Sequence, residues 1–192
     1  MNHKTYIMKF KPRNFNLLMK SGIFLVSMML LTFSCEEIND LTKFDIEYDK
    51  SFTVPATLGI DTPISISTPD ITTNSEEKFS GNDTKKDLVE EIVLKKLVLT
   101  LETPTDSDLS FLKSLTLYID ADGMDETEIA SSESISDDID KTLEMEIPSV
   151  DLKEYIFKDS FSIRTKVTTD ETISEEHEII AAMVFTVDAE VL

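Results

Sequence analysis

The sequence predicts an all-β fold: a single immunoglobulin-like β-sandwich of seven or eight strands with one to three short helices, preceded by a signal peptide. Two observations carry this prediction. Apolar and polar residues alternate with a period of two in several short segments, as in strands with one buried face. Stretches rich in Pro, Ser, Asp and Gly separate these segments, and no long helical pattern or internal repeat is visible. The chain has no Trp and a single cysteine, so the term immunoglobulin-like describes architecture only.

The first two strands are predicted at residues 44–54 and 64–67. In the first, apolar residues hold the even positions except at Lys50, and acids, Ser and Thr hold the odd ones. Pro55 and Gly59 then turn the chain. The second strand lies between two prolines, which suits the edge of a sheet because proline has no backbone donor there.

Residues 68–87 are rich in Ser, Thr, Asn, Asp and Lys and contain a single aromatic residue, so a surface loop is expected. A short helix capped by Asp83 or Thr84 should follow it. Three apolar residues would share one face of this helix: Leu88, Val89 and Ile92.

Period-two alternation returns in the middle of the chain. It predicts strands at 94–101, 115–119, 126–132 and 143–147. A helical turn is expected after Ser107, a tight turn at Asp122-Gly123, and a loop over the Ser/Asp-rich residues 131–140.

The C-terminal part is predicted to contain one helical turn and two strands. Ser149 opens the turn, whose apolar residues lie at 152–156, and strands follow at 161–167 and 178–191. The last strand is apolar on both faces because Ile180, Ala182 and Val184 add to the alternating set, so we expect it at the centre of a sheet.

The N-terminal residues have the organisation of a secretory signal. The 11-residue apolar segment 23–33 is too short to span a membrane, which takes about 20 residues, and matches the apolar region of a signal peptide. Five Lys and Arg and no Asp or Glu precede it, which keeps the N-terminus on the cytoplasmic side. This basic region is long, so Met8 and Met19 are alternatives to Met1 as the true start. Small Ser34 is followed by Cys35.

These residues resemble the precursor of a bacterial lipoprotein, in which a cysteine is lipidated and becomes the new N-terminus. Thr32 stands where such precursors usually have leucine, and this relaxed pattern is similar to that of Bacteroidota. Three acids after the cysteine resemble the signal that sends lipoproteins of that group to the cell surface: Glu36, Glu37 and Asp40. The resemblance covers residues 1–40.

The resemblance implies three parts: a lipoprotein signal peptide at 1–34, a lipidated flexible acidic tether at 35–43, and the β-sandwich domain at 44–192. Acyl chains such as palmitate on Cys35 would hold the protein on the bacterial outer membrane, at the cell surface or, alternatively, on the periplasmic face. An ordinary cleaved signal peptide would instead leave a free thiol in an oxidising compartment. An uncleaved membrane anchor would need a longer apolar run.

The charge of the mature part limits its partners. Residues 1–34 contain five of the 18 Lys and Arg and none of the 38 Asp and Glu, so their removal changes the formal net charge from −20 to −25. Nucleic acid requires a basic surface and is excluded. A surface rich in carboxylates is typical of a soluble domain.

The sequence contains few residues able to carry chemistry. None of the glycines is spaced for a phosphate-binding or nucleotide-binding loop, and no nucleophile elbow is present. His177 is the only histidine of the mature part, and the acids around it predict a solvated loop residue. A Ser/His nucleophile would have to use His177, and nothing marks its partner. We therefore expect no enzyme, no cofactor and no zinc site.

Two acidic clusters are candidates for calcium ligands. The first comprises Asp120, Asp122, Asp125, Glu126 and Glu128. Closely spaced carboxylates suit Ca²⁺, but Gly123 and Ser131 do not fit the glycine and glutamate positions of a helix-loop-helix calcium loop. A hairpin turn with solvated acids is the alternative, and whether this turn binds calcium stays open. The second cluster is expected to be loop: Glu133, Asp137, Asp138 and Asp140.

We therefore expect a membrane-anchored, non-catalytic lipoprotein that acts as a binding or accessory module. Its partners would be membrane lipid, through acylated Cys35, and an envelope protein or a glycan. The alternatives are a structural envelope lipoprotein without a small ligand and a hydrolase with two catalytic carboxylates. A groove lined by aromatic residues would favour a glycan, and an apolar surface patch would favour a protein.

Overall fold

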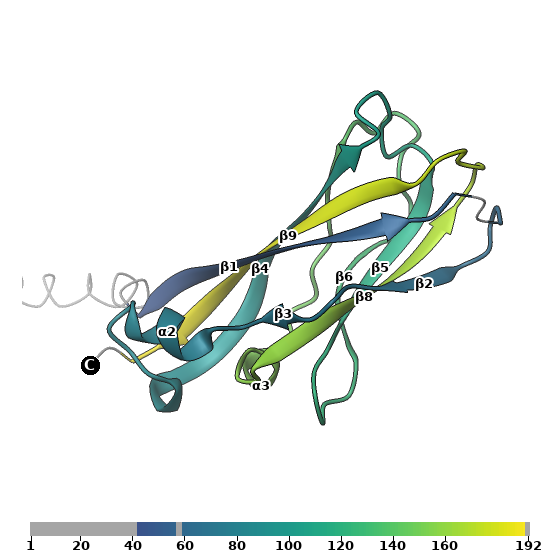
Figure 1. Ribbon diagram of the computed structural model, residues 1–192. Helices are drawn as coiled ribbons and strands as arrows, with labels where there is room; N and C mark the ends of the chain where they lie inside the picture. Colours follow the sequence, from purple (N-terminus) through teal and green to yellow (C-terminus); the bar gives the residue numbers. More distant parts are fainter. Residues whose placement is uncertain (1–41, 57–58, 191–192) are drawn as a thin grey trace, which may run out of the picture. The chain divides into compact units, whose positions relative to one another are not determined.

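The computed structural model describes residues 42–56 and 59–190, which contain nine strands, two short α-helices and one 3₁₀-helix (Figure 1). The strands are β1 (Lys43–Val54), β2 (Ile64–Ser67), β3 (Ile71–Thr72), β4 (Val89–Thr103), β5 (Leu112–Asp120), β6 (Thr127–Ser132), β7 (Thr142–Glu144), β8 (Ser160–Thr169) and β9 (His177–Ala189). The helices are α2 (Ser75–Ser80), η1 (Lys86–Leu88) and α3 (Lys153–Ile156). No helix in these two described ranges is long and apolar enough to cross a membrane.

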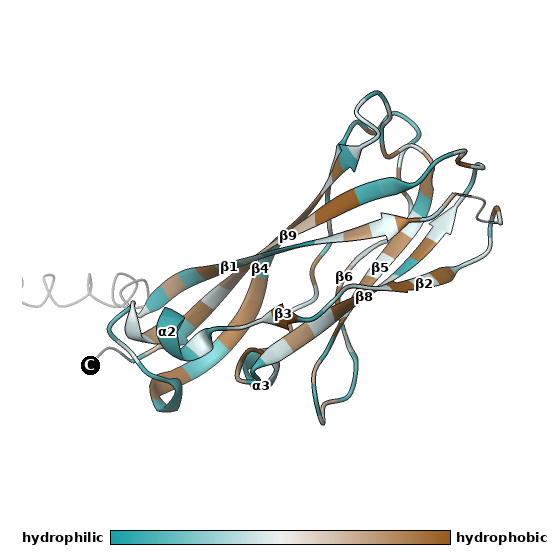
Figure 2. Cartoon of the chain, viewed as in Figure 1, coloured by the Kyte–Doolittle hydropathy of each residue, from teal (hydrophilic) through white to brown (hydrophobic). Residues whose placement is uncertain are grey.

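The strands form two antiparallel sheets. The first sheet has the order β1-β9-β4-β7, and the second has the order β2-β8-β5-β6, with β3 also paired to β8. Apolar and polar residues alternate along the strands, as Figure 2 shows, because one face of each sheet packs against the core. The predicted all-β sandwich is confirmed.

The order of the strands differs from that of immunoglobulin domains. A constant-type immunoglobulin domain places the first, second, fifth and fourth strands in one sheet. Here β1 pairs with the last strand, β9, and the chain changes sheet at most of its connections. With the two-residue β3 left aside, the order is that of a jelly roll, the eight-stranded double-sheet fold built from two Greek keys.

The core fills the space between the two sheets. Strand β9 lies between β1 and β4, as its two apolar faces predicted, and its odd-numbered residues point inward. At the centre, the ring of Tyr48 meets those of Phe161 and Phe185 edge-on, with centroids 5.3 and 5.7 Å away. The Tyr48 hydroxyl donates a hydrogen bond to the Thr73 carbonyl at 2.7 Å, so its polar atom is satisfied inside the core.

The prediction of a surface loop at 68–87 was wrong. This segment contains β3 and α2, and Phe79 of α2 is fully buried against Phe44 and Phe157. The predicted helix across Leu88, Val89 and Ile92 was also wrong, because β4 already begins at Val89 and only the three-residue η1 precedes it.

The predicted helical turn after Ser107 is absent from the described structure. Instead, irregular backbone places Leu109 and Phe111 in the core, and β5 begins at Leu112. The helical turn predicted after Ser149 is present as α3, with Tyr155 and Ile156 buried.

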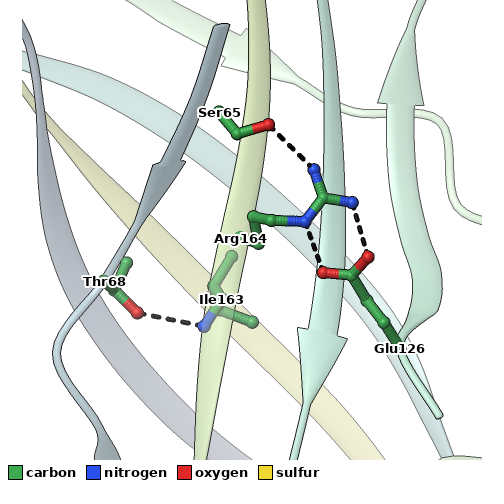
Figure 3. Close-up of polar contacts among 5 residues, drawn as sticks. All are labelled: Ser65, Thr68, Glu126, Ile163 and Arg164. Atoms are coloured by element: carbon green, nitrogen blue, oxygen red, sulfur yellow. Dashed lines mark hydrogen bonds and ion pairs between the residues drawn. The ribbon is translucent and has the colours of Figure 1, made fainter.

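A polar clamp crosses the solvent-facing side of the second sheet (Figure 3). Arg164 of β8 forms a bidentate ion pair with Glu126, donates a hydrogen bond to Ser65 of β2 at 3.1 Å, and lies 4.3 Å above the Tyr118 ring of β5. The guanidinium therefore joins β2, β8, β5 and the segment that leads into β6. On the adjacent edge, Thr68 accepts a hydrogen bond from the Ile163 amide at 3.0 Å and extends the pairing with β8.

We expect Arg164→Met to lower the free energy of unfolding by about 1 kcal/mol, because methionine keeps the apolar stem and removes the ion pair. The hydrogen bonds from Arg164 hold the pKa of the Glu126 carboxyl below its ordinary value. The ion pair therefore stabilises the folded state at pH values above the ordinary carboxyl pKa and is lost as the pH falls through the lowered pKa. Urea unfolding at neutral pH and at low pH measures both effects. An equal loss in Arg164→Met at both pH values would contradict this account.

Candidate functional site

Cys35, the predicted lipidation site, lies outside the residues that the structure describes, so its modification stays a prediction. The first strand begins at Lys43, eight residues after it in the sequence.

The acidic turn at 120–128 forms a hairpin connection in the structure. The Met124 amide donates to the Ala121 carbonyl at 3.0 Å, and Gly123 has φ +73°, a conformation that favours glycine. The Glu126 carboxylate already forms an ion pair with Arg164 and is therefore not free to bind a metal ion. No group of three or more His, Cys, Asp or Glu side chains within 42–56 and 59–190 is arranged to hold a metal ion.

The prediction that His177 is a solvated loop residue was wrong. His177 is the first residue of β9, only 4% exposed, and its ring centroid lies 4.4 Å from that of Phe111. It pairs with Val54, the last residue of β1, so it lies where β1 ends and β9 begins. Glu178, the next residue of β9, is exposed on the opposite side of the sheet, because alternate residues of a strand face opposite sides.

The structure brings Ser107 to His177 across 70 positions of sequence. The Ser107 Oγ lies 3.0 Å from Nε2 of the imidazole, and Nδ1 lies 3.1 Å from the Glu175 carbonyl oxygen. A carbonyl can only accept a hydrogen bond, so Nδ1 carries the proton of the neutral ring. The lone pair of Nε2 therefore faces Ser107, whose hydroxyl is the donor.

An open pocket lies over this pair. Its lining includes Ser107, Asp108, Ser110, Ser174 and His177. The hydroxyl and amide of Ser110 donate hydrogen bonds to Asp108, and these bonds hold the pKa of the Asp108 carboxyl below its ordinary value. From the sequence, a Ser/His pair would have to use His177, but no motif identified Ser107 as its partner. The sequence did contain a signal for the burial of the imidazole: His177 has an odd number, like the inward-facing residues of β9, and therefore lies on the same face of the strand.

The outward faces of the two sheets differ in chemistry. On the first sheet, five half-buried aliphatic residues of β4 and β9, which we call the apolar stripe, face solvent: Val93, Val98, Ile180, Ala182 and Val184. Val98 lies directly opposite Ala182 across the two strands. On the second sheet, the outward positions of β5 and β8 carry Ser, Thr, Lys, Arg, Asp and one Tyr.

Comparisons with known proteins do not assign this chain to a family. No family model matches it, and no curated protein matches it. Among solved structures, a chain titled Desmodium yellow mottle tymovirus aligns over 78% of this chain and 90% of that one, with 11% identity and a TM-score of 0.26. A TM-score at that level carries no argument about fold or function.

Proposed function

We propose that this chain is a lipoprotein held at the cell surface by acyl chains on Cys35, and that its sandwich is a binding module for a protein partner. The anchor is supported by the signal-like residues 1–34 and the single cysteine that follows them. Several acyl chains on one residue give lasting attachment, whereas one chain binds only marginally. The observation that carries the choice of a protein partner is the apolar stripe.

The second sheet shows that this domain has no need of aliphatic residues on a solvent-facing side. Thr, Ser and charged residues hold most of the outward positions of β5 and β8, although Val favours strands about as well as Thr. Strand preference alone therefore does not explain the aliphatic side chains on the outward positions of β4 and β9. Burial of these side chains against a partner would explain them. A glycan is less well supported, because the guanidinium of Arg164 covers one side of the outward-facing Tyr118 ring.

The charged residues around the apolar stripe indicate which charge the partner's contact surface should carry. Glu47 and Asp49 of β1 are exposed, and they pair in register with Val184 and Ala182 of the stripe. Two exposed lysines of β4 adjoin these residues: Lys95 is paired with Asp45 at 2.7 Å, and Lys96 lies in register with Val184. We infer a protein partner whose contact surface has an aliphatic centre and basic surroundings.

Photo-crosslinking in the native host tests this proposal. A photoreactive amino acid is placed at Val98 of the stripe, or at Thr116 on the other sheet as a matched control. We expect one discrete protein adduct from position 98 that high salt weakens, and none from position 116. Val184→Thr, which keeps the shape and the strand preference of the side chain, should reduce the adduct without changing the urea midpoint. Equal adducts from both faces, or an adduct indifferent to Val184→Thr, would contradict the proposal.

A further inference from the structure

Beyond this binding function, we propose that Ser107 is an activated nucleophile, a site at which the chain takes up an acyl or phosphonyl group from an uncharged electrophile. The inference rests on the contact of its hydroxyl with the unprotonated nitrogen of a buried imidazole, at 3.0 Å, over an open pocket. A nucleophile, a base that accepts its proton and a group that orients the base are the elements of serine activation. Here they are Ser107, His177 and the Glu175 carbonyl.

The imidazole is held in the orientation that this step requires. The Glu175 carbonyl fixes the proton on Nδ1, and the Phe111 ring packs against the imidazole at 4.4 Å between centroids. Burial on β9 prevents the ring from turning away. Ser107 itself is only half-buried and lines the pocket, so an electrophile can approach its Oγ.

Acyl transfer from an ester to Ser107 needs no reactant other than the ester. The Ser107 Oγ attacks the carbonyl carbon of an ester and forms a C–O bond while Nε2 of His177 takes the hydroxyl proton. The bond from that carbon to the leaving oxygen then breaks, and the alcohol departs with the proton from Nε2. The products are an acylated Ser107 and an alcohol, with His177 neutral again.

The surroundings favour modification over turnover and select the electrophile. Three amide groups near Ser107 are already used: those of Ser107, Leu109 and Ser110 donate to the Pro104 carbonyl, the Asp140 carbonyl and Asp108. They therefore offer little stabilisation to an oxyanion. Asp108, Glu171 and Glu175 line the same pocket, and their negative charges oppose anionic reagents while favouring the imidazolium that forms. We infer a stoichiometric reaction with neutral esters or phosphonates.

An uncharged alkyl fluorophosphonate is the probe: the Ser107 Oγ forms a P–O bond as the P–F bond breaks, and fluoride leaves with the proton that Nε2 of His177 accepted. The intact protein is treated with it, and the rate of adduct formation at each serine is followed by mass spectrometry of peptides. Ser110 and Ser174 lie in the same pocket and serve as internal controls, because neither is hydrogen-bonded to an imidazole in the described structure. General-base assistance contributes about 10²–10⁴-fold, so Ser107 should react at least about 100-fold faster than either control.

Two variants complete the test. His177→Gln should bring the rate at Ser107 down to that of the controls, and Ser162→Ala, on the outward side of β8 and outside this pocket, should leave it unchanged. If His177→Gln does not fold, the comparison of serines within the unaltered protein decides by itself. Reaction at Ser107 no faster than at Ser174 would overturn the proposal, as would an undiminished rate in folded His177→Gln.

Discussion

Replacement of Phe161 by alanine will lower the free energy of unfolding by about 3–5 kcal/mol, the usual cost of removing a buried phenylalanine side chain. Phe161 is 1% exposed and meets the rings of both Tyr48 and Phe185, at 5.3 and 6.3 Å between centroids. Its removal leaves a cavity at the point where the two sheets face each other. Urea or thermal unfolding of the residues from Thr42 onward measures the loss.

Ser162→Ala is the matched control for this prediction. Ser162 is the next residue of β8 and faces the opposite side of the sheet, where it is half-buried and outward. Its replacement should change the free energy of unfolding by no more than about 0.5 kcal/mol. If Phe161→Ala and Ser162→Ala destabilise the domain equally, the position of the core between the sheets is wrong.

Cys35→Ala will release the protein from the membrane fraction while leaving the fold of the domain unchanged. Each buried CH₂ of an acyl chain contributes about 0.8 kcal/mol to membrane binding, so loss of all acyl chains removes the attachment. The apolar segment 23–33 is too short to replace it as a spanning helix. Fractionation of cells followed by immunoblotting measures the shift.

Glu36→Gln serves as the control for fractionation, because it changes the adjacent residue and keeps the cysteine. It should stay in the membrane fraction. The urea midpoint of the domain should be the same in Cys35→Ala as in the unaltered protein, since Cys35 precedes the first strand. A Cys35→Ala protein that remained with the membrane would show that something other than the acyl chains holds it.

Regular alternation was enough to predict β1, β8 and β9, and it failed where the strand itself is irregular. In β4 the register against β9 shifts between Val89 and Glu91 and again between Leu94 and Lys96. Each bulge inserts a residue, so the inward-facing apolar residues lose their period of two. As a result, Leu88, Val89 and Ile92 have the spacing of residues on one face of a helix, and a helix was wrongly predicted there. Single buried residues such as Phe79 have no periodicity at all, which is why 68–87 was predicted as loop.

The order of the strands could not be predicted from these patterns. An immunoglobulin sandwich and a jelly roll contain strands of the same length and alternation, and they differ only in which strands pair. The pairing of β1 with β9 joins the two ends of the domain, and no local pattern encodes it.

The two candidate sites also differ in whether a local sequence pattern could predict them. Cys35 can be proposed as a lipidation site from the sequence because its signal is local: charge, apolar length and a small residue before the cysteine. The Ser107–His177 pair joins an irregular segment to the start of a strand, 70 positions away. The acids on either side of His177 predicted exposure, and only its parity with Ile179 and Ala181 in β9 pointed inward.

Mass spectrometry of N-terminal fragments of the protein extracted from native membranes tests the central claim most directly. We predict an N-terminal fragment that begins at Cys35 and carries the added mass of a diacylglyceryl group, with residues 1–34 absent. A fragment that retains those residues, or one that begins at an unmodified Cys35, would contradict the lipid anchor and the cell-surface function built on it.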